Sequence, residues 1–114
     1  MTICFTRGDT LKFKFLVKFQ DEKVISHSDV SELFVTIKKN EYTSKILFQK
    51  TLDDIEIDAT GYIHVEFRPS DTETLDYGKY LGDIEITLVN GTRKTKVFDF
   101  ELLAETTFHG GDVT

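Results

Sequence analysis

The chain has 114 residues, a net charge of −6 at pH 7 and a single cysteine, Cys4. This length is enough for one domain with its own hydrophobic core, and a single cysteine excludes an intramolecular disulfide. Because phosphate groups are bound by clustered Lys and Arg, the negative net charge argues against nucleic acid as a partner. The ten Phe and four Tyr, with no Trp, favour strands over helices.

Neither a signal peptide nor a membrane-spanning segment is predicted. Residues 1–10 contain no apolar run of the length that a signal peptide needs, and no later segment approaches the length of a transmembrane helix. We therefore expect no membrane partner, and we expect synthesis and assembly in a cytosol.

The first half of the chain predicts four strands. A short strand at 2–6 ends at a turn formed by residues 7–9. In the segment 10–19, large apolar side chains alternate with lysines, which is typical of a half-buried strand. A third strand is predicted at 33–38 and a fourth at 45–51, each bounded by polar residues.

The segment after the fourth strand is acidic. Residues 53–58 alternate acidic side chains with isoleucine, which predicts an edge strand with a solvated face. Gly61 then separates this segment from a strand predicted at 62–68. Pro69, the only proline, ends that strand because proline cannot donate to the ladder.

A helical turn and a hairpin complete the predicted elements. Ser70 and Glu73 have the spacing of a capping box, which predicts one helical turn through Leu75. The last two strands, 79–89 and 92–104, are joined by an Asn-Gly pair, which favours a two-residue type I′ hairpin turn.

Together these elements predict an all-β, immunoglobulin-like antiparallel β-sandwich of seven or eight strands. The sandwich is expected to cover residues 1–104 and to be followed by a C-terminal tail at 105–114. No repeat or linker indicates a second domain. The side chains predicted to form the core are Leu11, Phe13, Phe15, Val17, Ile63, Val65, Phe67, Tyr80, Ile84, Ile86, Phe98 and Phe100.

Leu75, Gly78 and Tyr80 form an LxxGxY pattern at the start of a predicted core strand. In immunoglobulin-like sandwiches a tyrosine near this corner bonds to the backbone a few residues upstream. We expect the Tyr80 hydroxyl to donate to a backbone carbonyl near residues 69–75. The residues with a predicted structural role in turns and corners are Gly8, Gly61, Leu75, Gly78, Tyr80, Asn90 and Gly91.

The acidic segment also contains the weak candidates for a metal site. Ca²⁺ takes six to eight oxygen ligands, but this segment lacks the glycine and the distal bidentate glutamate of a calcium loop. The three histidines are not at the spacing of zinc ligands. We therefore favour the edge-strand interpretation and expect no metal. The calcium candidates are Asp53, Asp54, Glu56 and Asp58.

Motifs for catalysis are absent from the sequence. It contains no nucleophile motif, no glycine-rich phosphate loop and no pair of carboxylates that the pattern itself brings into a cleft. We expect no catalytic residues, no cofactor and no enzymatic activity.

Three groups of residues within the segment 2–103 carry a family resemblance. They are the Gly8, Asp9, Thr10 turn before an alternating strand, then Pro69, Asp71 and Thr72 before Leu75, and finally Tyr80 through Ile86 with Asp83 and Ile84. On these residues the chain resembles small β-sandwich proteins of tailed bacteriophages and prophages of Gram-positive hosts, in particular the N-terminal domain of baseplate upper proteins.

The resemblance implies a non-enzymatic structural or assembly protein of the virion, in the tail, baseplate or neck, with other virion proteins as partners. Basic residues are in excess in 1–50 and acidic residues in 51–114. Such a distribution favours either charge balance within one sandwich or head-to-tail attraction between copies in a homo-oligomer.

The alternative function is a carbohydrate-binding or host-surface adhesion module. A sugar site needs exposed aromatic side chains in a row on one sheet, and Tyr62 and Tyr77 are the candidates. Residues 7–9 spell Arg-Gly-Asp, the integrin-recognition tripeptide, but glycine also suits the turn predicted there. We favour the turn.

Overall fold

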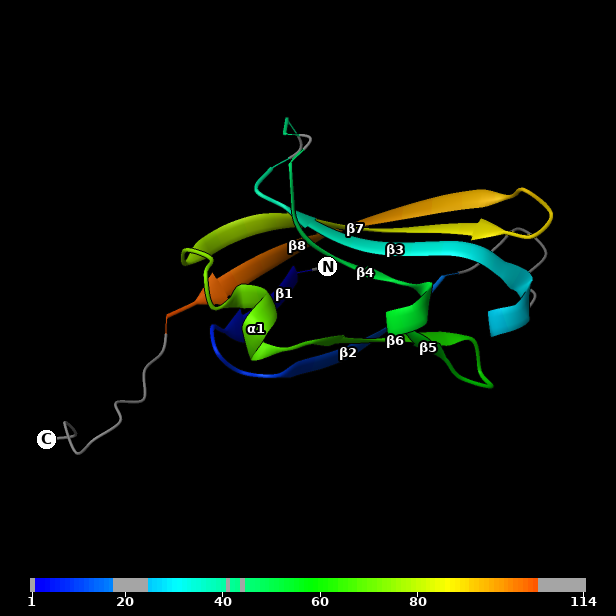
Figure 1. The fold of residues 1–114 in the computed structure, drawn as a ribbon, viewed down its shortest axis with the longest axis horizontal. Helices are drawn as coiled ribbons and strands as arrows, with labels where there is room; N and C mark the ends of the chain where they lie inside the picture. Colours follow the sequence, from blue (N-terminus) through cyan, green and yellow to red (C-terminus); the bar gives the residue numbers. More distant parts are fainter. Residues whose placement is uncertain (1, 18–24, 41, 44, 105–114) are drawn as a thin grey trace, which may run out of the picture.

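Two sheets of unequal size face each other in the computed structural model, which describes residues 2–17, 25–40, 42–43 and 45–104 (Figure 1). The larger sheet consists of β1 (Thr2–Thr6), β8 (Arg93–Leu103), β7 (Gly78–Leu88), β3 (Val30–Lys38) and β4 (Ile46–Thr51), in this spatial order. The smaller sheet consists of β2 (Leu11–Leu16), β6 (Tyr62–Phe67) and β5 (Glu56–Ile57). The predicted fold class, an immunoglobulin-like antiparallel β-sandwich, is confirmed.

Among the residues that the structure describes, three short helices lie between the strands. Two are single 3-10 turns, η1 (His27–Asp29) before β3 and η2 (Leu52–Asp54) after β4. The third is the four-residue helix α1 (Pro69–Thr72), which follows β6 and lies at one end of the sandwich (Figure 1). The predicted tail at 105–114 lies outside the described residues.

One strand pair departs from the antiparallel pattern. β1 runs parallel to β8, with Thr2 opposite Asp99 and Thr6 opposite Leu103. The other strand pairs of the described residues are antiparallel. β1 pairs with the second half of β8 and forms one edge of the larger sheet. Its Phe5 side chain is buried in the core.

The core lies between the sheets and follows the predicted alternation. Of the predicted core residues, ten are buried, whereas Leu11 and Phe13 are only partly buried. Both belong to β2, an edge strand that has a neighbour on one side only. Further buried apolar side chains are Phe5, Ile25, Val30, Leu33, Val35, Ile37, Ile55 and Leu102.

Phe67 lies at the centre of an aromatic cluster that connects the two sheets. Its ring centroid is 4.9 Å from those of Phe13 and Phe48, both in edge-to-face geometry, and it also contacts the rings of Phe5 and Phe100. Edge-to-face pairs add to the stabilisation that ring burial gives. The cluster therefore joins strands from both sheets in one packing unit.

The short helix differs from the predicted one. Its capping carboxylate belongs to Asp71, which accepts a hydrogen bond of 2.7 Å from the Arg68 N–H, and neither Ser70 nor Glu73 forms the predicted capping box. Proline at the first helical position has a preset φ, so the preceding residue, Arg68, becomes the N-cap.

The hairpin between β7 and β8 is present, but its predicted type I′ turn is wrong. The Gly91 N–H donates to the Leu88 carbonyl at 2.9 Å, and the Leu88 N–H donates to the Thr92 carbonyl at 2.8 Å. The loop therefore has three residues, and its last one, Gly91, has a φ of 92°. A three-residue hairpin loop needs a left-handed residue at this position, and the Asn90 side chain accepts a hydrogen bond from the Thr92 N–H.

The acidic segment 53–58 does not form one continuous strand as predicted. Its first two residues, Asp53 and Asp54, belong to η2. The Asp54 carboxylate caps the N-terminal end of this helix by accepting a hydrogen bond of 3.1 Å from the Thr51 N–H. Only Glu56 and Ile57 form a strand, β5, and this strand does lie at an edge of the smaller sheet.

Tyr80 fixes the corner between α1 and β7. The residue is 5% exposed, and its hydroxyl donates to the carbonyl of Asp76, directly after the segment 69–75 near which the acceptor was predicted. Burial, followed by the nearby Asp76 carboxylate, raises the pKa of the Tyr80 phenol. Among the other predicted turn residues, positive φ angles are found at Gly8, Gly61, Gly78 and Gly91.

Candidate functional site

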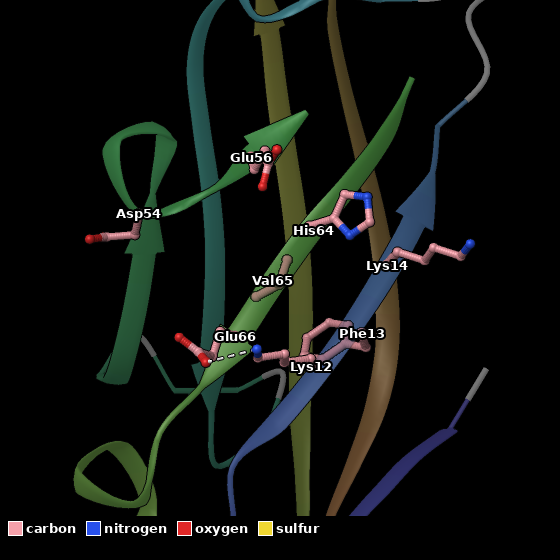
Figure 2. Close-up of a pocket in the computed structure, with 8 residues that line it drawn as sticks. All are labelled: Lys12, Phe13, Lys14, Asp54, Glu56, His64, Val65 and Glu66. Atoms are coloured by element: carbon pink, nitrogen blue, oxygen red, sulfur yellow. Dashed lines mark ion pairs between the residues drawn. The ribbon is translucent and has the colours of Figure 1, made fainter. Parts of the chain in front are cut away.

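A groove of about 600 Å³ lies on the smaller sheet (Figure 2). Strand β2 supplies one wall, β6 the floor, and η2 with β5 the other wall. Most of the lining side chains are charged, with both signs present. The lining residues are Lys12, Phe13, Lys14, Asp54, Glu56, His64, Val65 and Glu66.

The strand register arranges the central groove residues in one row. Lys14 pairs with His64 across β2 and β6, and His64 pairs with Glu56 across β6 and β5. Neighbouring strands are about 4.8 Å apart, so the position of His64 on the sheet lies between those of a lysine and a glutamate. Figure 2 shows Lys14 pointing away from His64 at the outer edge of β2.

Glu66 is a groove carboxylate that is already paired with two cationic side chains. Its two oxygens contact Lys12 at 3.9 Å and Arg68 at 3.1 Å. All three side chains are solvent-accessible, so these pairs contribute little to the free energy of folding. They do fix the positions of the charges along one side of the groove.

His64 is held by a carboxylate from the loop before β6. Its Nε2 lies 2.6 Å from Asp58 Oδ2, and Asp58 Oδ1 accepts hydrogen bonds from the Thr60 hydroxyl and from the N–H groups of Thr60 and Tyr62. The hydrogen bonds from Thr60 and then from His64 hold the pKa of Asp58 well below its usual range. The imidazole is therefore oriented by a carboxylate that stays ionised.

An oriented imidazole alone does not make a catalytic site. None of the described residues that line the groove is a Ser, Thr or Cys that His64 could activate. The cysteine of the chain, Cys4, lies on the outer face of the larger sheet, where its thiol lies 3.6 Å from Glu101. Loss of hydration, together with the Glu101 carboxylate, raises the pKa of this thiol, which disfavours the reactive thiolate.

The calcium candidates are not brought together. Asp54 caps η2, and Asp58 holds His64 and its own loop, so two of the four carboxylates are engaged within the chain. In residues 2–17, 25–40, 42–43 and 45–104, no group of three or more His, Cys, Asp or Glu side chains could hold a metal ion.

The two predicted sugar-stacking tyrosines lie apart and are both in contact with a cation. Lys14 Nζ lies 4.6 Å from the ring centroid of Tyr62. The Arg7 guanidinium lies 4.2 Å from the ring centroid of Tyr77 and donates to the Tyr77 hydroxyl at 2.6 Å. Each cation covers a ring face that a sugar would need for stacking.

The Arg-Gly-Asp segment forms a turn in which the arginine is engaged. Besides its contact with Tyr77, the Arg7 guanidinium donates to the carbonyl of Leu75 at 3.1 Å. The Asp9 N–H closes the turn by donating to the Thr6 carbonyl at 3.1 Å. This arginine therefore connects the β1–β2 turn to the segment before β7.

The outer face of the larger sheet carries a second carboxylate with a shifted pKa. Loss of hydration raises the pKa of Asp83, with Lys38 opposing the shift and Glu85 adding to it. Asp83 pairs with Val97 on one side and with Thr36 on the other. It does not line the groove of the smaller sheet, and we assign it no site.

The groove was missed by sequence reasoning for a specific reason. Alternation showed that Lys12, Lys14, His64 and Glu66 point outward, but not which of them are neighbours. The spacing of β2 and β6 along the chain is more than 40 residues, so only the pairing register brings Lys14 next to His64. The signal that the sequence did contain was the alternation of Lys12 and Lys14 with apolar residues, which predicts that both lysines face outward.

No protein-family model and no curated protein sequence matches this chain. Among solved structures, the chain is similar to CopC from Methylosinus trichosporium OB3b, with a TM-score of 0.50 and 11% sequence identity. The similarity covers 95% of this chain and 89% of that chain. At this identity the similarity shows a shared β-sandwich fold. None of the helices that the structure describes has the length and apolar character to cross a membrane.

Proposed function

We propose that this protein is a non-enzymatic structural or assembly component of a tailed-phage or prophage virion, in the tail, baseplate or neck. It acts there through contacts with other virion proteins or with further copies of itself. The sequence resemblance to baseplate upper proteins supports this assignment, and the β-sandwich provides rigid sheet edges and faces for such contacts.

The observation that carries the proposal is a pair of charges without a counter-ion on opposite edges of the smaller sheet. Lys14 on β2 has no carboxylate partner among the described residues, and Glu56 on β5 has no cationic partner among them. Both lie on strands, so their positions are fixed by the sheet. Charges in fixed positions steer a protein partner and select its orientation more than they add affinity.

The groove chemistry favours a protein partner over a substrate or a sugar. Its walls carry both signs of charge, and its imidazole has no nucleophile to activate among the described groove residues. The candidate stacking rings are covered by Lys14 and Arg7.

The test is the location of the protein in particles. Virions are induced from the host, purified by density-gradient centrifugation, and labelled with an antibody against this chain for electron microscopy. We expect a constant number of copies per particle and label at the tail, baseplate or neck. Purified virions that lack the protein would contradict the proposed function, and a capsid protein of the same particles serves as the positive control.

A further inference from the structure

The two edges of the smaller sheet carry opposite charges in the same alternating pattern. On the basic edge, β2 presents Lys12 and Lys14 outward, while Leu11, Phe13 and Phe15 face the core. On the acidic edge, Glu56 faces outward and Ile57 faces the core. Asp54 extends beyond this edge, on the side away from β2 (Figure 2). No strand of the described residues pairs with the outer side of either edge.

Rows of side chains run across the sheet from one edge to the other. One row is Lys14, His64 and Glu56, and the next is Phe15, Ile63 and Ile57. Because β2 and β5 are both antiparallel to β6, they run parallel to each other. A second copy shifted across the sheet by its own width therefore continues both rows, with its Lys14 next to Glu56 and its Phe15 next to Ile57.

The charges select this arrangement over the symmetric ones. Pairing two β2 edges would place lysines against lysines, and pairing two β5 edges would place carboxylates against carboxylates. Like charges directly opposite each other destabilise a strand pair, whereas opposite charges stabilise it. Charged edges normally prevent sheets from pairing with each other, but here the two edges are complementary.

We propose that the smaller sheet continues from copy to copy, with β5 of one copy beside β2 of the next, Glu56 facing Lys14 and Ile57 packing beside Phe15. The inference rests on the proposed function, because a virion component is present in several copies. The contact is head-to-tail, so successive copies form a ring if the rotation between them closes and a filament if it does not.

Analytical ultracentrifugation of the purified full chain, over a range of protein and salt concentrations, tests this arrangement. We expect self-association that weakens as the salt concentration rises, because exposed charge pairs are screened. Lys14→Glu and Glu56→Lys are each expected to weaken the association at least about tenfold, because each places like charges opposite each other at the contact. Lys79→Glu, an exposed reversal on the larger sheet, is the matched control and leaves the association unchanged.

Charge complementation provides the sharper result. The Lys14→Glu chain has two acidic edges and the Glu56→Lys chain has two basic edges, so each alone is expected to associate more weakly than the wild-type chain. An equimolar mixture of the two is expected to associate, because each acidic edge then meets a basic one. The double variant Lys14→Glu/Glu56→Lys exchanges the edges within one chain and is expected to associate with itself. Circular dichroism of each variant confirms that it is folded.

The inference would be overturned by a monomer at every concentration at low salt, by a mixture of the folded variants that fails to associate, or by an association that the Lys79→Glu control removes. If a chain that ends at Leu103 no longer associates, the contact depends on the segment after Leu103. This result would also overturn the inference. None of these results affects the labelling of virions. The labelling therefore tests the proposed function independently of the self-association.

Discussion

At the scale of single residues, Gly82 shows how tightly two neighbouring strands of the larger sheet pack. It lies on β7 opposite Phe98 of β8, and the Phe98 ring covers its Cα so closely that a Cβ atom would overlap three ring carbons. The backbone conformation does not require glycine here, since its φ is not positive. Gly82 is needed because the ring occupies the space of a side chain.

We therefore expect Gly82→Ala to lower the free energy of unfolding by about 1–3 kcal/mol through overpacking. Denaturant unfolding measures this change. Combining it with Phe98→Leu should cost less than the sum of the two single changes, because the smaller side chain leaves room for the methyl group. Strict additivity in this cycle would show that the ring is not the cause.

Asp58 gives the chain a defined acid response. Its carboxylate accepts four hydrogen bonds, including one from His64, and its pKa lies below the ordinary value of about 3.9. A lowered pKa in the folded state stabilises the fold fully above the unfolded-state pKa, and this contribution is lost as the pH falls towards the folded-state pKa.

Melting temperatures of the wild-type protein and of Asp58→Asn are expected to differ at neutral pH and to converge below about pH 4. The asparagine keeps an oxygen for the Thr60 and Tyr62 donors, so the difference reports the charge. A gap between the two proteins that stays constant down to pH 2 would contradict this linkage.

At the scale of elements, one ion pair connects α1 to β4. Lys50 Nζ lies 2.7 Å from Asp71 Oδ2, and the two side chains are only 16% and 17% exposed. The same Asp71 oxygen accepts the hydrogen bond from Arg68 that begins the helix. The pair therefore closes the edge of the sandwich beside β4 and positions α1, which leads to the Tyr80 corner.

Lys50→Met keeps the aliphatic stem but leaves a largely buried carboxylate without its cation, so we expect a loss of about 1–3 kcal/mol in unfolding free energy. The matched control is Arg93→Met, which breaks the exposed pair of Arg93 with Glu85 at 3.5 Å and should cost at most about 1 kcal/mol. Equal effects of the two substitutions would show that burial does not strengthen the Lys50 pair.

At the scale of the whole molecule, the aromatic cluster makes the two sheets one cooperative unit. Phe67 from the smaller sheet contacts Phe100 and Phe48 from the larger sheet and Phe13 from its own. Its side chain is fully buried. Neither sheet can cover its apolar face without the other.

Phe67→Ala is accordingly expected to destabilise the protein by about 3–5 kcal/mol, from lost burial and the cavity that remains. Far-ultraviolet circular dichroism and tyrosine fluorescence should follow a single shared transition, as in two-state unfolding. Tyr42→Ala, at a side chain that is 89% exposed, is the control and should stay within about 0.5 kcal/mol. Two separate transitions in the wild-type protein would contradict a single unit.

Local patterns in the sequence determined the strands and the face that each side chain takes. Alternation placed Phe15, Ile63 and Ile84 in the core and Lys12 and Lys14 outside it, because successive side chains of a strand point to opposite faces. The hairpin and the tyrosine corner followed from residue types that turns require.

Only the tertiary structure decided which strands are neighbours. The parallel pairing of β1 with β8 joins segments distant in sequence, and so does the pairing of β2 with β6 that puts Lys14 in one row with His64 and Glu56. The three-residue hairpin loop is local, but it depends on the register of β7 and β8, which the Asn-Gly pair alone did not specify. Alternation has a period of two in every strand, so it contains no information on partner or register. Packing of the two sheets selects both, and through them it places a basic and an acidic edge on the same sheet.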